Sequence, residues 1–312
     1  MSNDTLSKGA LSNSTLLQNA TGPIEFKMTN DYMFRAVCQK NELVLKGLIC
    51  SLLNLSETEL KSIVIQNPIC LGEAIHDKDI ILDLHILLND EKRLNIEMQV
   101  ANEGDWCERS VFYLCRSFCQ LQKGKLYLDT LPTVQIGILN FSLFPDSPEF
   151  YARNLLMNSK THEVYSSKIA LHVLSLESTD LATAEDRACK LDYWAKLFKA
   201  KTWEDMKMLA KNNTALHEAA VTLRELSADE KIRLQCEARE RYEMDQRAIL
   251  ENGVRQGIKQ GLEQGIEQGT KRQKELDAAI IAEKNKALSE KEKALFEKDK
   301  EIAALKTKLD QT

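Results

Sequence analysis

Two carboxylates, Asp83 and Glu97, stand on either side of a short polar turn, and Gln99 follows Glu97 by two residues. Apolar and polar residues alternate on both sides of this turn, which predicts two strands that each bury one face. The first strand covers residues 80–88 and the second covers residues 92–100. Asp83 lies on the polar face of the first strand, while Glu97 and Gln99 share the polar face of the second.

The length of the turn decides how the two strands pair. A two-residue loop would oppose polar and apolar side chains, whereas a three-residue loop at residues 89–91 sets Leu84 opposite Ile96 and Asp83 opposite Glu97. Like charges directly opposite each other destabilise a ladder unless a cation lies between them. Mg²⁺ prefers such oxygen ligands, so the pair predicts a metal site. The alternative is an ordinary solvent-facing pair, which costs only about a few tenths of a kcal/mol.

Length and charge set limits on the class of protein. The chain has 312 residues, enough for one large domain or two with a proper core. Its apolar runs are short and interrupted, so no membrane span is expected. The formal net charge of −5 does not indicate nucleic-acid binding by the chain as a whole. Any affinity for phosphates would have to come from a local basic stripe, a metal ion or both.

The N-terminal residues and the cysteines predict a cytoplasmic protein. Residues 1–22 lack a basic start followed by an apolar block, so we expect a disordered tail and not a secretory signal. The eight cysteines show no CxxC pairs at zinc spacing, which favours free thiols. Free thiols fit a reducing compartment such as the cytoplasm.

A helix is predicted between residues 104 and 123, directly after the second strand. Its period puts Arg109, Tyr113, Arg116 and Gln120 on one polar stripe. The other side is expected to face the core, and it carries Val111, Phe112, Cys115, Phe118 and Cys119. A polar stripe is usually a solvated helix face, but this one follows the acidic strand closely enough to pack beside it.

Capping and period signals set out the remaining elements. Asn30-Asp31 has the form of a helix start, and a second helix is expected over residues 41–54. Further strands are expected at residues 63–65, 132–144, 149–157 and 168–176. From residue 183 to residue 242 the period is helical, with an aromatic cluster that we expect in the core: Tyr193, Trp194, Leu197, Phe198 and Trp203.

The C-terminal part repeats glycine every four residues and then becomes almost wholly charged. The repeat comprises Gly253, Gly257, Gly261, Gly265 and Gly269. Each glycine costs a helix about 1 kcal/mol relative to alanine, but the stripe permits close helix approach. The charged residues between the glycines exclude a membrane dimerisation motif. After residue 271 apolar residues recur every seven positions, while the second apolar position of the heptad is mostly Lys. A weak coiled coil and a solvated single helix therefore both remain open.

Several segments, in their order and spacing, resemble one known family. Asn30 to Phe34 resembles its N-D-x-x-F start, Asp83 with residues 95–99 resembles its D…(N)IEMQ core, and residues 109–113 resemble its R-S-x-x-Y helix. Residues 124–131 and 138–141, residues 237–240 and the glycine repeat resemble its later segments. The family is the recombination-promoting nuclease and putative transposase group of the PD-(D/E)XK superfamily. The resemblance covers residues 27–269.

The resemblance implies an α/β (α+β) fold like that of restriction endonucleases. A mixed sheet would be flanked by helices and followed by a helical region and a long C-terminal helix or coiled coil. It also implies Mg²⁺-dependent cleavage of DNA, with Mn²⁺ as a substitute, in which Asp83 and Glu97 bind the metal. Gln99 stands where most of the superfamily has lysine; it can orient a water molecule but brings no positive charge. We therefore expect slow chemistry.

The resemblance also implies supporting residues around the catalytic set of Asp83, Glu97 and Gln99. Asp31 is either the additional metal-binding acid that the superfamily places on its first helix or only a helix cap. Glu73 is a second candidate for that acid. The polar stripe at Arg109, Tyr113 and Arg116 would bind DNA phosphates or support the site.

Five segments follow from these observations. They are a disordered tail at residues 1–22, a nuclease-like domain at 23–180, a helical region at 181–250, the glycine repeat at 251–270, and a charged helix or weak coiled coil at 271–312. The C-terminal helix is expected to join copies of the chain into a homo-oligomer.

Two functional hypotheses remain. The first is a metal-dependent DNA endonuclease linked to recombination or to a mobile element, which the intact Asp83, Glu97 and Gln99 favour. The second is a catalytically inactive protein that interacts with DNA or protein and oligomerises through its C-terminal helix, which the acidic balance and the charged tail favour.

Overall fold

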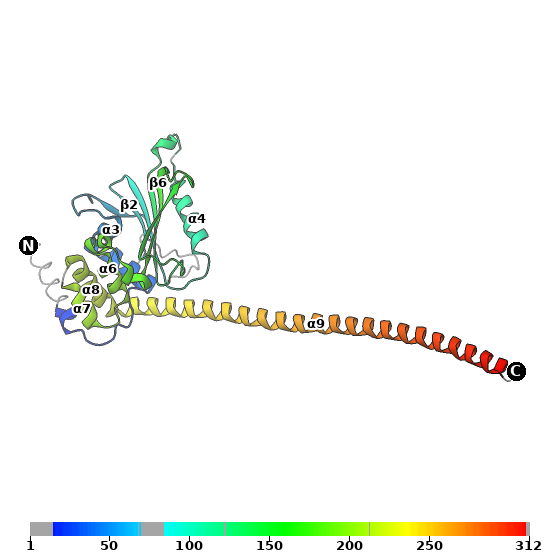
Figure 1. Cartoon of the computed structure of the whole chain (residues 1–312). Helices are drawn as coiled ribbons and strands as arrows, with labels where there is room; N and C mark the ends of the chain where they lie inside the picture. The colour runs from blue at the N-terminus through cyan, green and yellow to red at the C-terminus, as the bar shows by residue number, and fades with distance from the viewer. Residues whose placement is uncertain (1–14, 68, 70–83, 122, 212, 310–312) are drawn as a thin grey trace, which may run out of the picture. The chain divides into compact units, whose positions relative to one another are not determined.

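The computed structural model describes residues 15–67, 69, 84–121, 123–211 and 213–309 of the chain (Figure 1). It divides into two compact units, Met1–Tyr242 and Glu243–Thr312, each taken by itself below. The described part of the first unit contains one mixed sheet and the helices that pack on it.

The sheet has six strands in the order β1-β2-β3-β4-β6-β5. Their bounds are β1 Ile63–Ile65, β2 Leu84–Leu88, β3 Lys92–Gln99, β4 Thr133–Leu139, β5 Tyr151–Met157 and β6 Val164–Ser175. The central strands β3, β4 and β6 run parallel, whereas the outer pairs are antiparallel. This confirms the expected mixed sheet.

The β2–β3 hairpin has the register that its pattern predicts. Leu84 lies opposite Ile96, and a three-residue loop joins the two strands. Asn89 and Asp90 in this loop have left-handed φ angles of 51° and 59°. Asparagine and aspartate adopt this conformation more readily than other non-glycine residues. The turn chemistry and the apolar alternation therefore select the same pairing.

The described chain also contains the following helices, which are separated by turns and loops. They are α2 Asp31–Lys40, α3 Glu42–Leu53, α4 Trp106–Phe118, α5 Ala184–Ala188, α6 Leu191–Lys199, α7 Trp203–Ala210, α8 Thr214–Ser227 and α9 Glu230–Leu309, with short 3-10 turns η1 Tyr127–Asp129 and η2 Leu176–Leu181. Asn30 caps α2 by accepting a hydrogen bond from the Met33 amide at 3.1 Å, as the sequence predicts.

The core lies on one face of the sheet. Leu94 and Ile96 of β3 are buried together with Phe34, Leu48 and other residues of α2, α3, α6 and α8. Figure 1 shows α4 on the opposite face from α3 and α6. The sheet is thus a middle layer of the described residues, with the apolar core on one face and α4 across the other.

The orientation of α4 differs from the expectation. Phe112 is 62% exposed and Val111 is 47% exposed, although both were expected to face the core. Cys115 and Cys119 are exposed as well. The buried residues of α4 are Trp106, Ser110 and Leu114. The helix covers the polar face of β3, so its mixed polar and aromatic side is the one that faces inward.

Other expected core residues behave as predicted, and the N-terminal segment adds to them. Trp194 and Phe198 are fully buried and lie in contact, with ring centroids 5.9 Å apart. Within the segment expected to be a disordered tail, Leu17 and Ala20 are each 3% exposed and belong to the core. The described core therefore includes residues that precede residue 23.

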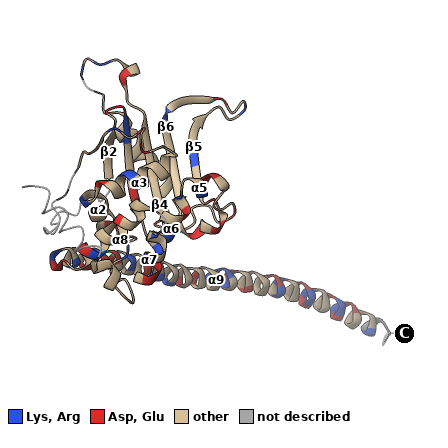
Figure 2. Ribbon diagram, turned by 90° about the vertical axis from the view of Figure 1, so that its left-hand side faces the viewer, with Lys and Arg blue, Asp and Glu red and all other residues tan. Residues whose placement is uncertain are grey.

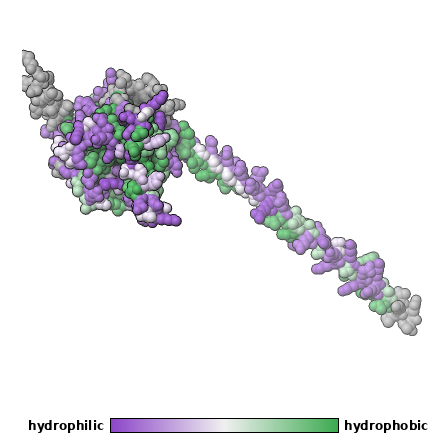
Figure 3. Space-filling model, turned by 90° about the horizontal axis from the view of Figure 1, so that it is seen from above, coloured by the Kyte–Doolittle hydropathy of each residue, from purple (hydrophilic) through white to green (hydrophobic). Residues whose placement is uncertain are grey.

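The second unit consists of the remainder of α9. Every residue of α9 from 244 to 306 is exposed. Figure 2 shows basic and acidic residues mixed along the helix, and Figure 3 shows apolar residues between them. A Cβ added at any of the five repeat glycines would meet nothing within 4 Å among the described residues. No described helix is both long enough and apolar enough to cross a membrane.

Candidate active site

The candidate site begins with the polar row of β3. Its odd-numbered residues, Arg93, Asn95, Glu97 and Gln99, point to the face of the sheet that α4 covers, because side chains alternate along a strand. Glu97 is only 7% exposed. Strand β4 lies beside β3, and Gly137 is the residue paired with Glu97.

Gly137 lets α4 approach the sheet closely. A Cβ at this position would lie 2.1 Å from Cζ2 of Trp106, which is far inside van der Waals contact. Trp106 is 3% exposed, so its ring is fixed between the helix and the strand. The first turn of α4 is thereby anchored directly beside the carboxylate of Glu97.

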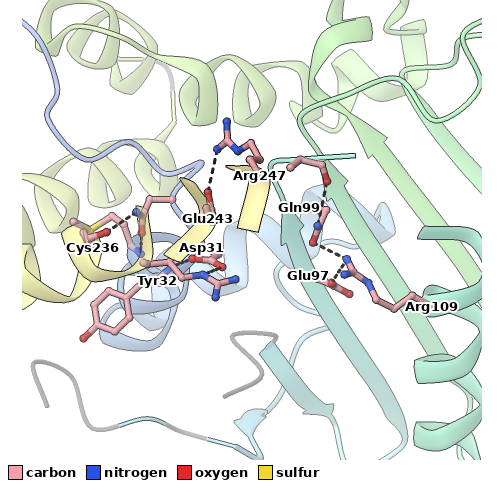
Figure 4. Close-up of polar contacts among 12 residues, drawn as sticks. Asp31, Tyr32, Glu97, Gln99, Arg109, Cys236, Glu243 and Arg247 are labelled. Atoms are coloured by element: carbon pink, nitrogen blue, oxygen red, sulfur yellow. Dashed lines mark hydrogen bonds and ion pairs between the residues drawn. The ribbon is translucent and has the colours of Figure 1, made fainter. Parts of the chain in front are cut away.

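Arg109 follows one turn later on α4 and reaches the two candidate site residues of β3, Glu97 and Gln99. Its Nη2 donates to Oε1 of Glu97 at 2.8 Å and to Oε1 of Gln99 at 2.6 Å (Figure 4). The Gln99 amide nitrogen donates in turn to the carbonyl oxygen of Ala101 at 3.2 Å, so the amide oxygen faces the arginine. One cationic nitrogen therefore holds two oxygens that stand two residues apart on one strand.

The guanidinium of Arg109 has two further contacts near the edge of the site. Its Nη1 lies 3.6 Å from Oε2 of Glu103, whose side chain is 52% exposed. Its Cζ lies 5.5 Å from the centre of the Trp106 ring, a cation–π distance. Arg109 is thus a link between the buried carboxylate and the partly exposed end of α4.

The donor set fits a hard divalent cation. A carboxylate oxygen of Glu97 and an amide oxygen of Gln99 converge on the same positively charged nitrogen. Mg²⁺ takes oxygen ligands of this kind and keeps several waters, so it needs few protein ligands. No group of three or more His, Cys, Asp or Glu residues among the described residues could hold a metal. Asp83 and Glu73 lie outside the described residues.

Asp31 lies in a separate network in Figure 4. Its Oδ2 accepts a hydrogen bond from Nε of Arg239 at 2.6 Å, and its Oδ1 accepts one from the Tyr32 amide at 2.7 Å. Burial raises the pKa of Asp31, and Arg239 works in the opposite direction. These hydrogen bonds join Asp31 to the first turn of α2 and to Arg239 of α9, and not to Glu97 or Gln99.

Tyr113 and Arg116 of the predicted polar stripe lie further along α4. Tyr113 packs edge-on against Phe112, with ring centroids 5.8 Å apart. Arg116 is exposed but acts electrostatically on His85 of β2. The pKa of His85 is lowered mainly by burial, then by Arg35 and Arg116. Arg109 is the residue of the stripe that donates hydrogen bonds to Glu97 and Gln99.

Sequence reasoning missed Trp106, Gly137 and Glu103. A glycine inside a strand often marks the close approach of another group, so Gly137 carried a usable signal. The identity of that group, Trp106, depends on a contact between distant segments. Glu103 lies in the connection between β3 and α4, where no local pattern marked it.

Comparison with known proteins places these residues inside one family. Residues 28–253 match the family described as PD-(D/E)XK nuclease family transposase. The match includes the whole sheet, α4 and the start of α9. Neither the curated proteins nor the solved structures gave a significant match. Since the matched span is more than half of the chain, the protein belongs to the PD-(D/E)XK nuclease family transposases, which confirms the resemblance drawn from its sequence.

Proposed function

We propose that this protein is a Mg²⁺-dependent DNA endonuclease, with Mn²⁺ as a substitute metal. Family membership already indicates a nuclease- or transposase-like function that acts on DNA. Cleavage of internal phosphodiester bonds, the choice of Mg²⁺ and a link to recombination or to a mobile element are the further content of the proposal. A cytoplasmic location belongs to it as well and rests on the cysteine pattern.

The observation that carries the proposal is the convergence of Glu97 and Gln99 on one cationic nitrogen. Both residues stand on β3 within the family span, and their oxygens lie 2.8 Å and 2.6 Å from Nη2 of Arg109. A buried carboxylate is costly unless it has a cation to face. The pair is therefore arranged to hold positive charge at this point of the sheet.

In the proposed mechanism each residue has one task. Asp83 and Glu97 would hold the metal ion. When bound, the ion would polarise the scissile phosphate and lower the pKa of a water molecule. Gln99 would orient that water through its amide, and the absence of a lysine at this position makes the chemistry slow. Asp31 is a weaker candidate ligand, because its carboxylate belongs to a separate network with Arg239 and the Tyr32 amide.

DNA would approach along the exposed side of α4. Arg109, Tyr113 and Arg116 are the residues of this helix that we assign to phosphate contacts or to support of the site. Arginine suits this task because its guanidinium can bind two phosphate oxygens at once. The positive charge is local, which agrees with a chain whose net charge is negative.

The first test is nicking of supercoiled plasmid with and without Mg²⁺. Asp83→Ala and Glu97→Ala should abolish metal-dependent nicking. Glu185→Ala is the matched control, because Glu185 also pairs with an arginine, Arg153 at 3.2 Å, but lies elsewhere on the fold. Cutting that survives both site variants would mean that the site is misplaced or that another nuclease is present.

A second candidate function is an inactive interaction protein that assembles through α9. Four apolar residues of the glycine repeat, Val254, Ile258, Leu262 and Ile266, are 55–68% exposed. Such a row on an otherwise charged helix favours contact with a second copy of the chain. We propose a homo-oligomer on this ground under either function. A monomeric mass in sedimentation at working concentrations would contradict it, and folded protein that cuts with neither Mg²⁺ nor Mn²⁺ would favour this second function.

A further inference from the structure

Arg109 stands at the point where side-chain oxygens of Glu97 and Gln99 converge. Its Nη2 is within 2.8 Å of Glu97 Oε1 and within 2.6 Å of Gln99 Oε1. The same nitrogen makes both contacts, so it occupies the point on which the two oxygens converge. Figure 4 shows the guanidinium directed at both side chains from α4.

The charge at this point cannot be removed by losing a proton. The guanidinium of arginine stays protonated at every pH that the protein tolerates. A divalent cation beside it would meet strong repulsion, because like charges at about 4 Å repel by about 1 kcal/mol per unit-charge pair in water and more in a partly buried site. The two cations therefore compete for the same two oxygens.

The side chain of Arg109 has an alternative position close by. Glu103 lies 3.6 Å from Nη1 and is half exposed, so it offers a second carboxylate towards solvent. The arginine side chain is itself 22% exposed, whereas Trp106 below it is almost fully buried. The guanidinium can thus turn outward while the ring keeps α4 anchored to β4.

We propose that Arg109 is an exchange residue, whose guanidinium holds Glu97 and Gln99 together until it is displaced by a divalent cation. Once displaced, the guanidinium of Arg109 would pair with Glu103 or with a DNA phosphate. Metal binding and phosphate binding are then coupled through one side chain. This inference rests on the proposed function, since it assumes that the metal binds at Glu97, and it adds the amide oxygen of Gln99 as a further ligand.

The first measurement is Mn²⁺ affinity by calorimetry on the full chain. Arg109→Met, which keeps the length of the side chain but removes the charge, should lower the dissociation constant about tenfold, within the usual range of coupling between sites. Arg153→Met is the matched control, because Arg153 also pairs with a glutamate at 3.2 Å and stacks on a ring at 5.4 Å. It should leave the affinity unchanged, and Glu97→Gln should abolish the binding.

The second measurement uses tryptophan fluorescence and does not depend on the folding of an Arg109 variant. Displacing the guanidinium from the Trp106 ring should change the emission of the wild type on addition of Mn²⁺. Trp106→Phe should remove this change. Trp203→Phe should retain it, although Trp203 also carries an arginine, Arg224, 5.4 Å from its ring.

Each outcome separates the inference from the function beneath it. Suppose that the wild type binds metal and cuts DNA, while Arg109→Met binds metal equally well or more weakly. This result would overturn the exchange role of Arg109 but would not contradict the nuclease function. It would mean that Arg109 positions the ligands and does not compete for them. Wild type that neither binds metal nor cuts DNA would overturn both.

Discussion

Gly137→Ala tests how closely α4 must approach the sheet. The added Cβ would lie 2.1 Å, 2.7 Å and 2.9 Å from Cζ2, Cη2 and Cε2 of Trp106. Carbon atoms in good contact are about 3.5–4.0 Å apart, so the ring would have to move by more than about 1 Å. Gly137 pairs with Glu97 of β3 and with Val173 of β6, and the strand therefore cannot yield.

The expected cost follows from this overlap. Overpacking a buried site typically costs about 1–3 kcal/mol, and the absence of a movable neighbour places Gly137→Ala near about 3 kcal/mol. Because Trp106 anchors α4, the same change should also shift Arg109 away from Glu97. Both effects have one origin, the loss of room under the indole ring.

Urea unfolding followed by tryptophan fluorescence would measure the cost. All three tryptophans lie in the first unit, so α9 beyond that unit does not contribute to the signal. The double variant Gly137→Ala/Trp106→Leu should lose less unfolding free energy than the two single variants together, by at least about 1 kcal/mol. The reason is that the smaller leucine side chain leaves room for the added methyl group. A Gly137→Ala variant within about 0.5 kcal/mol of wild type, or strictly additive changes, would refute the close-packing argument.

Three further predictions concern polar side chains of the sheet. Burial lowers the pKa of His172 to about 4, so between about pH 6.5 and pH 4 the unfolded chain binds a proton that the folded chain does not. The free energy of unfolding should therefore fall by about 3 kcal/mol as the pH is lowered through this range. Urea titrations of His172→Asn should show a smaller fall. Asn95 donates to Gln135 at 2.7 Å with both side chains at most 2% exposed, so Asn95→Leu should cost about 2 kcal/mol, and Asn95→Leu/Gln135→Leu should recover at least half of it in the same assay. Gln99→Lys removes an amide oxygen and adds a cation beside Arg109, so calorimetry should show Mn²⁺ binding weakened by roughly tenfold. Unchanged affinity would show that the Gln99 oxygen is not a metal ligand.

The hairpin was predictable because its signals are local. Apolar alternation, the length of the loop and the turn residues Asn89 and Asp90 all lie within a short stretch of chain and agree with one another. The predicted pairing of Leu84 with Ile96 followed from these alone. The expected pairing of Asp83 with Glu97 lies outside the described residues and stays a prediction.

The orientation of α4 was not predictable in the same way. Its helical period defines a polar and an apolar side, but the surface that it meets decides which side is buried. Here that surface is the polar row of β3, so Trp106 faces inward and Phe112 faces outward. The rule that apolar residues face the core assumed a partner that this helix does not have.

Contacts between distant segments were also beyond the sequence. Asp31 and Arg239 are 208 residues apart, yet their side chains lie 2.6 Å from each other. Nothing in either stretch indicates the other. The sequence could therefore offer Asp31 as a metal ligand or a cap, while its arginine partner required the folded chain.

The two repeats of α9 imply different supercoils. At 100° per residue, a repeat of four residues advances its stripe by about 40°, whereas a repeat of seven falls back by about 20°. The first drift favours a right-handed crossing between helices, and the second favours a left-handed one. The glycine repeat and the heptads that begin at Ile281 therefore cannot both be followed by one partner helix of constant handedness. An assembly built on α9 would have to reverse its twist, or change its partner, between residues 269 and 281.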